Sequence, residues 1–190
     1  MIQSPDTKQL IVNVFVKLLR ERPFDKITII DIAKKAHINR NTFYYYFSDV
    51  IDLLSYIIER SKTEYFINRE DVDTLNELIT IFIDTMNKDR SIIKNLFSSR
   101  DVNTIIRLVD ETVRDICDIC VERELSHNPE FSIEEKRVIA EFYSTILEGF
   151  VIRMISSKDP GSYISQFEKL RSILESRLPY QIIREELERS

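Results

Sequence analysis

The sequence predicts an all-α protein, and three observations support that prediction. The 190 residues include only two glycines and five prolines, whereas a β architecture needs turn signals about every 8–12 residues. Apolar residues recur at the spacing of one helix face along most of the chain. Capping residues and prolines stand where these stretches begin and end. At 43% hydrophobic content, the chain can also bury a core, as one domain or two small ones.

The first helix is predicted from Ser4 to Arg22. Ser4 is a favoured N-cap residue, and Pro5 suits the first helical position. Pro23 ends the helix, because the residue before a proline is pushed out of the α region. Six apolar residues form one face of this helix: Leu10, Ile11, Val14, Phe15, Leu18 and Leu19.

A capping box predicts where the second helix begins. Thr28 and Asp31 have the spacing at which each side chain bonds to the backbone N–H of the other residue. A short helix should follow to about Lys35. Its inward residues are expected to be Ile29, Ile32 and Ala33.

The third and fourth helices are predicted directly after it. Asn39 begins a short helix that runs to Phe47. Asp49 and Asp52 then repeat the capping-box spacing ahead of the fourth helix. The fourth helix has an apolar stripe: Val50, Leu53, Leu54, Ile57 and Ile58.

Beyond residue 68 the pattern predicts four or five more helical segments and no internal repeat. These lie at about 73–87, 92–97, 102–124, 132–156 and 162–178. Ser132 should cap the segment at 132–156, which carries Ile139, Phe142, Ile146 and Phe150 on one face. We therefore expect two domains: a three-helix head at residues 1–48 and a helical-bundle body at residues 49–190.

Three short helices, with the second and third joined by a tight turn, describe a homeodomain-like helix-turn-helix. In this geometry the first residues of the third helix project into the major groove of DNA: Asn39, Arg40, Asn41 and Thr42. An asparagine can bond an adenine edge, an arginine a guanine edge, and a threonine either a base or a phosphate. The helix N-terminus also favours phosphate through its backbone N–H groups. The predicted partner is therefore double-stranded DNA.

The charges along the chain are distributed as expected for a protein that contacts DNA with only one of its ends. The net charge of −5 is unfavourable for a DNA-binding protein. Residues 1–47, however, carry eight Lys/Arg and four Asp/Glu, which gives +4, so the remainder carries −9. A basic head on an acidic body is expected to meet phosphate with the head alone.

The sequence gives little support for a metal, redox or catalytic site. Cys117 and Cys120 are the only cysteines, and the histidines that could complete a zinc site, His37 and His127, are far away in the sequence. The CxxC spacing lacks the βαβ context of a redox motif, so two buried helical thiols are the simpler interpretation. No nucleophile stands at a recognisable spacing from a base. We therefore expect no enzyme, no metal and no cofactor.

Neither a membrane segment nor a secretion signal is predicted. No apolar run approaches the roughly 20 residues that span a bilayer. The first residues lack the basic and apolar regions of a signal peptide. A cytoplasmic protein without a membrane partner is expected.

Residues 27–47 read ITIIDIAKKAHINRNTFYYYF. This segment closely resembles the signature of the TetR family, which reads roughly T-I/V-x-x-I-A-x-x-A-G-I/V-S/T-x-x-T-F/L-Y-x-H/Y-F. The aromatic run TFYYxF followed by D-I/V-x-D-L-L looks like one branch of that family. The resemblance covers about residues 8–58, while the rest of the chain is similar to the family only in the number and length of its helices.

The resemblance implies a DNA-binding head and a helical body that dimerises and usually holds an inducer pocket. By position, Thr28 and Tyr44 would hold phosphate, and Tyr45 and Tyr46 would lie near it. Phe43 and Phe47 would lock the recognition helix into the head. Because repression predominates in the family, a repressor is expected.

The sequence departs from the family pattern at two positions. His37 replaces the glycine of the turn, and we interpret it as a strained residue in the left-handed region, which histidine tolerates better than most residues. Val50 stands where most members place a phosphate-binding lysine. The cationic phosphate contacts near the recognition helix must therefore come from other residues.

Those contacts are expected from Lys34, Lys35 and Arg40, with Lys8 and Lys26 as further candidates. Each lost phosphate contact flattens the slope of log affinity against log salt by about 0.9, so we predict a modest slope. A simpler role also fits the two neighbouring lysines, which would then only solvate the second helix.

The predicted mechanism uses a homodimer. Two chains would pair through a four-helix bundle built from residues of about 132–156 and 162–178, and present recognition helices about 34–36 Å apart or somewhat more to a palindromic operator. A small-molecule effector in the body would favour a spacing that releases DNA. The alternative is a TetR-like protein that acts through a partner protein and binds little DNA of its own.

Overall fold

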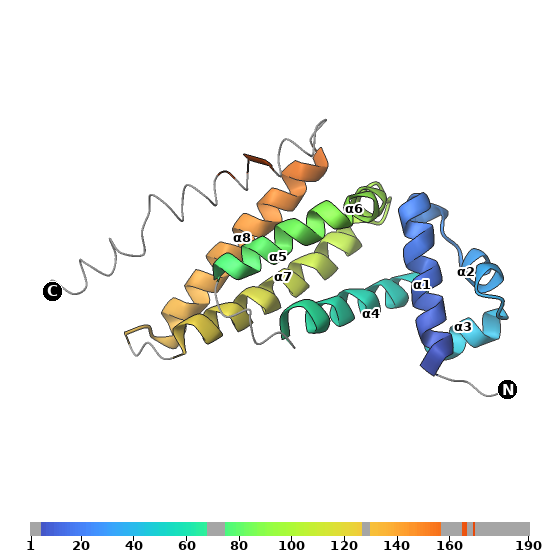
Figure 1. Cartoon of the computed structure of the whole chain (residues 1–190), viewed down its shortest axis with the longest axis horizontal. Coiled ribbons are helices and arrows are strands. Elements are labelled where there is room, and N and C mark those ends of the chain that lie inside the picture. The colour runs from blue at the N-terminus through green and yellow to red at the C-terminus, as the bar shows by residue number, and fades with distance from the viewer. Residues whose placement is uncertain (1–4, 68–74, 127–129, 157–164, 167–168, 170–190) are drawn as a thin grey trace. The chain divides into compact units, whose positions relative to one another are not determined.

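The computed structural model describes residues 5–67, 75–126, 130–156, 165–166 and 169, and in these ranges all regular structure is helical (Figure 1). The chain divides into two compact units, Met1–Glu148 and Gly149–Ser190. The contacts described below lie within the first unit. The predicted all-α class is confirmed.

The head has the predicted order of helices, and α1, α2 and α3 form the blue group in Figure 1. The elements up to residue 62 are α1 (Pro5–Glu21), the 3-10 turn η1 (Phe24–Lys26), α2 (Ile29–Lys35), α3 (Arg40–Tyr46) and α4 (Val50–Lys62). α1 ends before Pro23, as predicted, and the expected cap Ser4 lies outside the described residues. α1 packs against α2, and α2 packs against α3.

Local capping explains where α2 and α4 begin. Thr28 Oγ1 accepts the N–H of Asp31 at 3.2 Å, and Asp31 Oδ2 accepts the N–H of Thr28 at 3.0 Å, which confirms the predicted capping box. At α4, Asp49 accepts the N–H of Asp52 at 2.8 Å, but the Asp52 carboxylate accepts the N–H of Ser48 rather than that of Asp49. The return bond of the predicted box is therefore displaced by one residue.

The body continues with a short π-helical turn and four helices. These are η2 (Thr63–Ile67), α5 (Leu75–Lys88), α6 (Arg90–Phe97), α7 (Val102–Leu125) and α8 (Ile133–Ser156). α7 packs against α4, α5 and α6. The predicted helix at 162–178 lies almost entirely outside the described residues. Of the helices that the structure describes, none is long and apolar enough to cross a membrane.

Of the apolar residues that the sequence places on one face of α8, Phe150 is buried, whereas Phe142 and Ile146 are exposed. Ala140, Ser144 and Leu147 are buried, whereas Phe142 and Ile146 are 63% and 38% exposed. The helix carries apolar residues on both sides, so periodicity alone does not decide which side faces the core. Two residues of the predicted apolar face therefore point to solvent.

One buried cluster joins the head to the body. Phe15 of α1, Ile32 of α2 and Phe43 of α3 are fully buried in it. Leu96 of α6 and Ile105 of α7 belong to the same cluster. The head therefore shares its hydrophobic core with helices that lie far along the chain.

Polar bonds reinforce this junction. The Asp25 carboxylate in η1 accepts the Ser99 hydroxyl at 2.5 Å and the Arg100 N–H at 2.8 Å, and these two bonds, the Ser99 bond above all, lower the pKa of Asp25. Asn95 Nδ2 donates to the carbonyl of Leu19 at 2.9 Å. The end of α1 and the loop after it are thereby bonded to α6 and the turn that follows α6.

The two cysteines are buried side chains of α7, as expected. Burial raises the pKa of the Cys117 thiol to about 12. The thiol therefore stays protonated at neutral pH, and a protonated thiol is a poor nucleophile and a poor metal ligand.

Candidate nucleic-acid interface

α3 is the predicted recognition helix, and Asn39 caps it. Asn39 Oδ1 accepts the N–H of Thr42 at 2.7 Å and the hydroxyl of Thr42 at 3.0 Å. A two-bond contact to adenine uses both the oxygen and the nitrogen of an asparagine amide. Because the oxygen is already engaged, the geometry gives Asn39 a structural role at the start of α3. Base contacts by Asn39 and Thr42 stay predictions.

The outward face of α3 carries the other predicted DNA-contacting residues. Arg40 and Asn41 are exposed, and the Tyr44 and Tyr45 side chains are 54% and 63% exposed. In the part of the chain that the structure describes, no carboxylate forms an ion pair with Arg40. These four side chains are therefore available to a ligand outside the protein.

The inward face of α3 holds the helix in the head. Phe43 has no exposed surface, and Phe47 is 3% exposed. Their ring centroids lie 5.9 Å apart. The aromatic run thus splits as the sequence predicts, with one side in the core and two tyrosines outside.

The N-terminus of α2 is the second predicted contact. The Thr28 hydroxyl donates to Asp31 Oδ2 at 2.7 Å, and Arg22 forms an ion pair with the same oxygen at 3.1 Å. These bonds, led by that of the Thr28 hydroxyl, lower the pKa of Asp31. With its side chain engaged in the cap, Thr28 leaves the unpaired N–H groups of the first turn as the donors for a phosphate.

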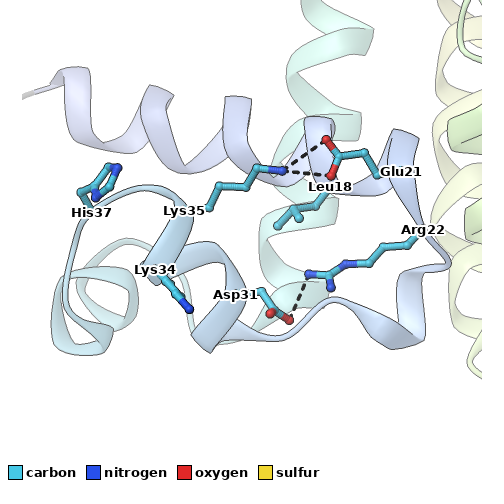
Figure 2. A pocket seen from close by; sticks show the side chains of 7 residues that line it. All are labelled: Leu18, Glu21, Arg22, Asp31, Lys34, Lys35 and His37. Atoms are coloured by element: carbon cyan, nitrogen blue, oxygen red, sulfur yellow. Dashed lines mark hydrogen bonds and ion pairs between the residues drawn. The ribbon is translucent and has the colours of Figure 1, made fainter.

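An open hollow of about 520 Å³ lies between α1 and α2 (Figure 2). Lys35 crosses it to Glu21, with 2.9 Å between Nζ and Oε2, and this hydrogen bond is the main reason why the pKa of Glu21 is lowered. Figure 2 shows Lys34 pointing away from Glu21. Among the described side chains, Lys34 has no carboxylate partner. Of the two predicted lysines, Lys34 is thus the one whose charge is not already paired.

His37 closes the turn between α2 and α3 in the left-handed region, with φ 53°. The N–H of Ile38 bonds to the carbonyl of Ala33 at 3.0 Å, and the N–H of His37 bonds to the carbonyl of Lys34 at 3.3 Å. These two bonds form a Schellman motif, whose left-handed position is usually glycine. The predicted left-handed conformation of His37 is confirmed.

The sequence did not predict the side-chain contacts that hold Arg22, Lys35 and Lys8 in place. The partners of Arg22 and Lys35 lie nine and fourteen residues away on other elements. Lys8, a further candidate for a phosphate contact, lies against the ring of Tyr56. No local motif signals such pairs, because they arise only when the helices pack.

Comparison with known proteins agrees with this geometry. Residues 11–57 match the sequence model described as bacterial regulatory proteins, tetR family. Over 71 residues the chain is 34% identical to the HTH-type dhaKLM operon transcriptional activator DhaS of Lactococcus lactis subsp. lactis (strain IL1403). That alignment spans 37% of this chain and 38% of the relative's own length.

The likeness to solved structures extends over most of the chain. A dihydroxyacetone kinase operon activator DhaS has a TM-score of 0.62 at 20% identity, over 88% of this chain and 95% of its own. A putative TetR-family transcriptional regulator from Syntrophomonas wolfei str. Goettingen has a TM-score of 0.61 at 17% identity, over 94% and 99%. At these identities the likeness shows a shared fold.

The chain therefore has a head with a helix-turn-helix DNA-binding fold, and this head is joined to a helical body. The sequence of the head, residues 11–57, matches the tetR-family model, and the described helices share their fold with the solved structures named above.

Proposed function

We propose that the chain is a sequence-specific DNA-binding transcriptional regulator. The observation that carries the proposal is the exposed face of α3, where Arg40 and Asn41 lie in the first turn and Tyr44 and Tyr45 follow. This face stands on a head whose sequence matches tetR-family regulators. The first turn of such a helix is the part that contacts base edges in a helix-turn-helix.

Each residue of the interface has a proposed role. Arg40 and Asn41 read base edges, and the two exposed tyrosines bond to phosphate through their hydroxyls. Lys34 supplies the unpaired positive charge beside them. The side chains of three further residues are engaged in helix caps: Thr28, Asn39 and Thr42. They mainly shape the helix ends, and they contact phosphate or bases only through donor groups that are not used in the caps. Lys35 contributes less, because Glu21 already pairs with it.

The test is operator binding by the full chain. A binding site is first selected from random duplexes and from the DNA upstream of the protein's own gene. We then expect Arg40→Ala to weaken binding to that site by about 1–3 kcal/mol, roughly 5- to 150-fold in Kd, and to relax the base preference at one position.

The matched control is Arg90→Ala, which removes an exposed arginine of α6 outside the head. It should leave Kd unchanged. If the wild-type chain selects no site, or if Arg40→Ala weakens all duplexes equally, sequence-specific reading by α3 is refuted. Absence of any DNA binding would point to a regulator that acts through a partner protein.

We further propose that the protein works as a homodimer that contacts itself through α8. Val138, Phe142 and Ile146 are exposed at intervals of four residues, and a contiguous apolar face of this kind is typical of protein interfaces. The second helix predicted for this bundle, at 162–178, lies almost entirely outside the described residues. A two-fold dimer also presents two recognition helices to a palindromic site.

Phe142→Glu should convert the dimer to a monomer in light scattering, because it places a charge at the centre of an apolar contact. The control is Glu141→Gln, which changes an exposed neighbour on the same helix. A Phe142→Glu protein that stays dimeric would place the interface elsewhere. The monomer should also bind its operator much more weakly, since one half-site remains per molecule.

The sign of regulation has two candidates. The resemblance to the family favours a repressor that a small-molecule effector in the body releases from DNA, and such an effector must bind the free state more tightly than the DNA-bound state. The relative named as a dhaKLM operon activator favours activation. A promoter–reporter fusion separates them, because deletion of the gene raises expression under a repressor and lowers it under an activator.

A further inference from the structure

The ammonium of Lys8 in α1 lies over two aromatic rings. Its Nζ lies 3.7 Å from the ring centroid of Tyr56 on α4 and 5.3 Å from that of Phe47 at the end of α3. Both distances are within the range of a cation–π contact. Among the residues that the structure describes, no carboxylate pairs with it. The aromatic rings are its partners.

The Tyr56 and Phe47 rings connect Lys8 to the end of the recognition helix α3. The Tyr56 ring lies 5.5 Å from that of Phe47, centroid to centroid. Phe47 is the C-cap residue of α3, and its N–H bonds to the carbonyl of Phe43 at 3.0 Å. One ammonium group therefore contacts the residue that ends α3 and the helix that follows it.

A second contact lies on the same side of α1. Arg60, one turn after Tyr56 on α4, donates to Gln9, the neighbour of Lys8. Glu64 holds Arg60 at 2.7 Å. Two residues after Arg60, the Lys62 ammonium lies 2.8 Å from the Asp115 carboxylate on α7. The C-terminal half of α4 is thus bonded both to α1 of the head and to α7.

We propose that Lys8 is a positioning residue for DNA reading and not a phosphate contact. Its ammonium sets the position of Phe47 against Tyr56 and so fixes the orientation of α3 within the head. The proposal rests on the proposed function of α3. It assigns Lys8 to specificity, whereas a phosphate contact contributes equally to binding of any sequence.

The experiment compares Lys8→Met, Lys8→Arg and Lys34→Met in the full chain, with Kd measured against salt for the selected operator and for an unrelated duplex. Lys8→Met should weaken operator binding about 3- to 10-fold at every salt concentration, with the slope and the binding of unrelated DNA unchanged. Lys8→Arg should restore most of the affinity, because a guanidinium also stacks on aromatic rings. Lys34→Met should weaken both duplexes and flatten the slope by about 0.9.

Two outcomes overturn the proposal: a slope that Lys8→Met flattens by about 0.9, or operator binding that it leaves unchanged. A protein that merely unfolds in part would lose both duplexes equally and would not be restored by arginine. Amide exchange in the free protein supplies a readout without DNA, in which Lys8→Met should speed exchange at Phe47 and Lys34→Met should not. If the wild-type chain binds no DNA, the proposed function fails, and unchanged exchange at Phe47 then refutes the positioning role as well.

Discussion

His37 has a backbone conformation that histidine occupies at a cost. Its φ of 53° is forced by the two Schellman bonds that end α2. A left-handed residue with a Cβ is less stable there by about 1–2 kcal/mol, since the Cβ approaches the next carbonyl. Helix-turn-helix geometry is therefore reached here without the usual glycine.

We expect His37→Gly to raise the free energy of unfolding by up to about 1 kcal/mol. The strain is relieved, and the greater freedom of glycine in the unfolded chain offsets part of the gain. Urea unfolding of both proteins at one pH measures the difference. A loss of more than about 1 kcal/mol would show that the imidazole makes a stabilising contact.

At the scale of elements, η1 is bonded to the turn after α6. Both oxygens of Asp25 accept hydrogen bonds there, from a buried hydroxyl and from a backbone N–H. The pKa of Asp25 is lowered by these bonds. Its carboxylate therefore stabilises the fold above the ordinary carboxyl pKa of about 3.9, and the stabilisation is lost as pH falls through the lower value of the folded protein.

Asp25→Asn should accordingly lower Tm by a few degrees at pH 7, because the amide cannot accept both bonds. The difference from the wild type should shrink as pH falls below about 4, where the carboxyl protonates in the unfolded chain, and vanish once pH is below the lower pKa of the folded protein. Thermal unfolding across this pH range measures it. Asp84→Asn, on the exposed side of α5, is the control and should show no such dependence. A constant difference at every pH would exclude the ionised carboxylate as the cause.

The elements also show why some features were predictable and others were not. The cap of α2 was predictable, because both of its partners lie within four residues of each other. The split of the aromatic run of α3 followed from helical periodicity. The bond of Asp25 to Ser99 joins residues that are 74 positions apart, and no pattern along the chain specifies it. The exposure of Phe142 and Ile146 on α8 was not predictable, because both sides of that helix carry apolar residues.

At the scale of the molecule, the cluster that contains Phe15 and Phe43 also contains Leu96 and Ile105. α6 and α7 therefore complete the interior of the head. The apolar side chains on either side of the boundary predicted near residue 48 are buried together.

Leu96→Ala should destabilise the whole first unit by about 2–5 kcal/mol, the usual cost of such a truncation in a core. Amide exchange should accelerate in α1, α2 and α3 as well as in α6, although the substitution lies outside the head. Leu10→Ala is the control, since Leu10 is 42% exposed and a surface change usually costs less than about 0.5 kcal/mol. Acceleration confined to α6 would mean that the head is stable by itself.

If α3 reads an operator as proposed, the shared interior also determines which substitutions can change the DNA sequence that is read. A head exchanged between two such chains would arrive with side chains fitted to another α6 and α7, and its core would be left underfilled or overfilled. Substitutions on the outer face of α3 carry no such penalty, because Arg40, Asn41, Tyr44 and Tyr45 project away from the core. Changes of target should therefore accumulate as single replacements on that face, while recombination at the boundary between head and body is selected against.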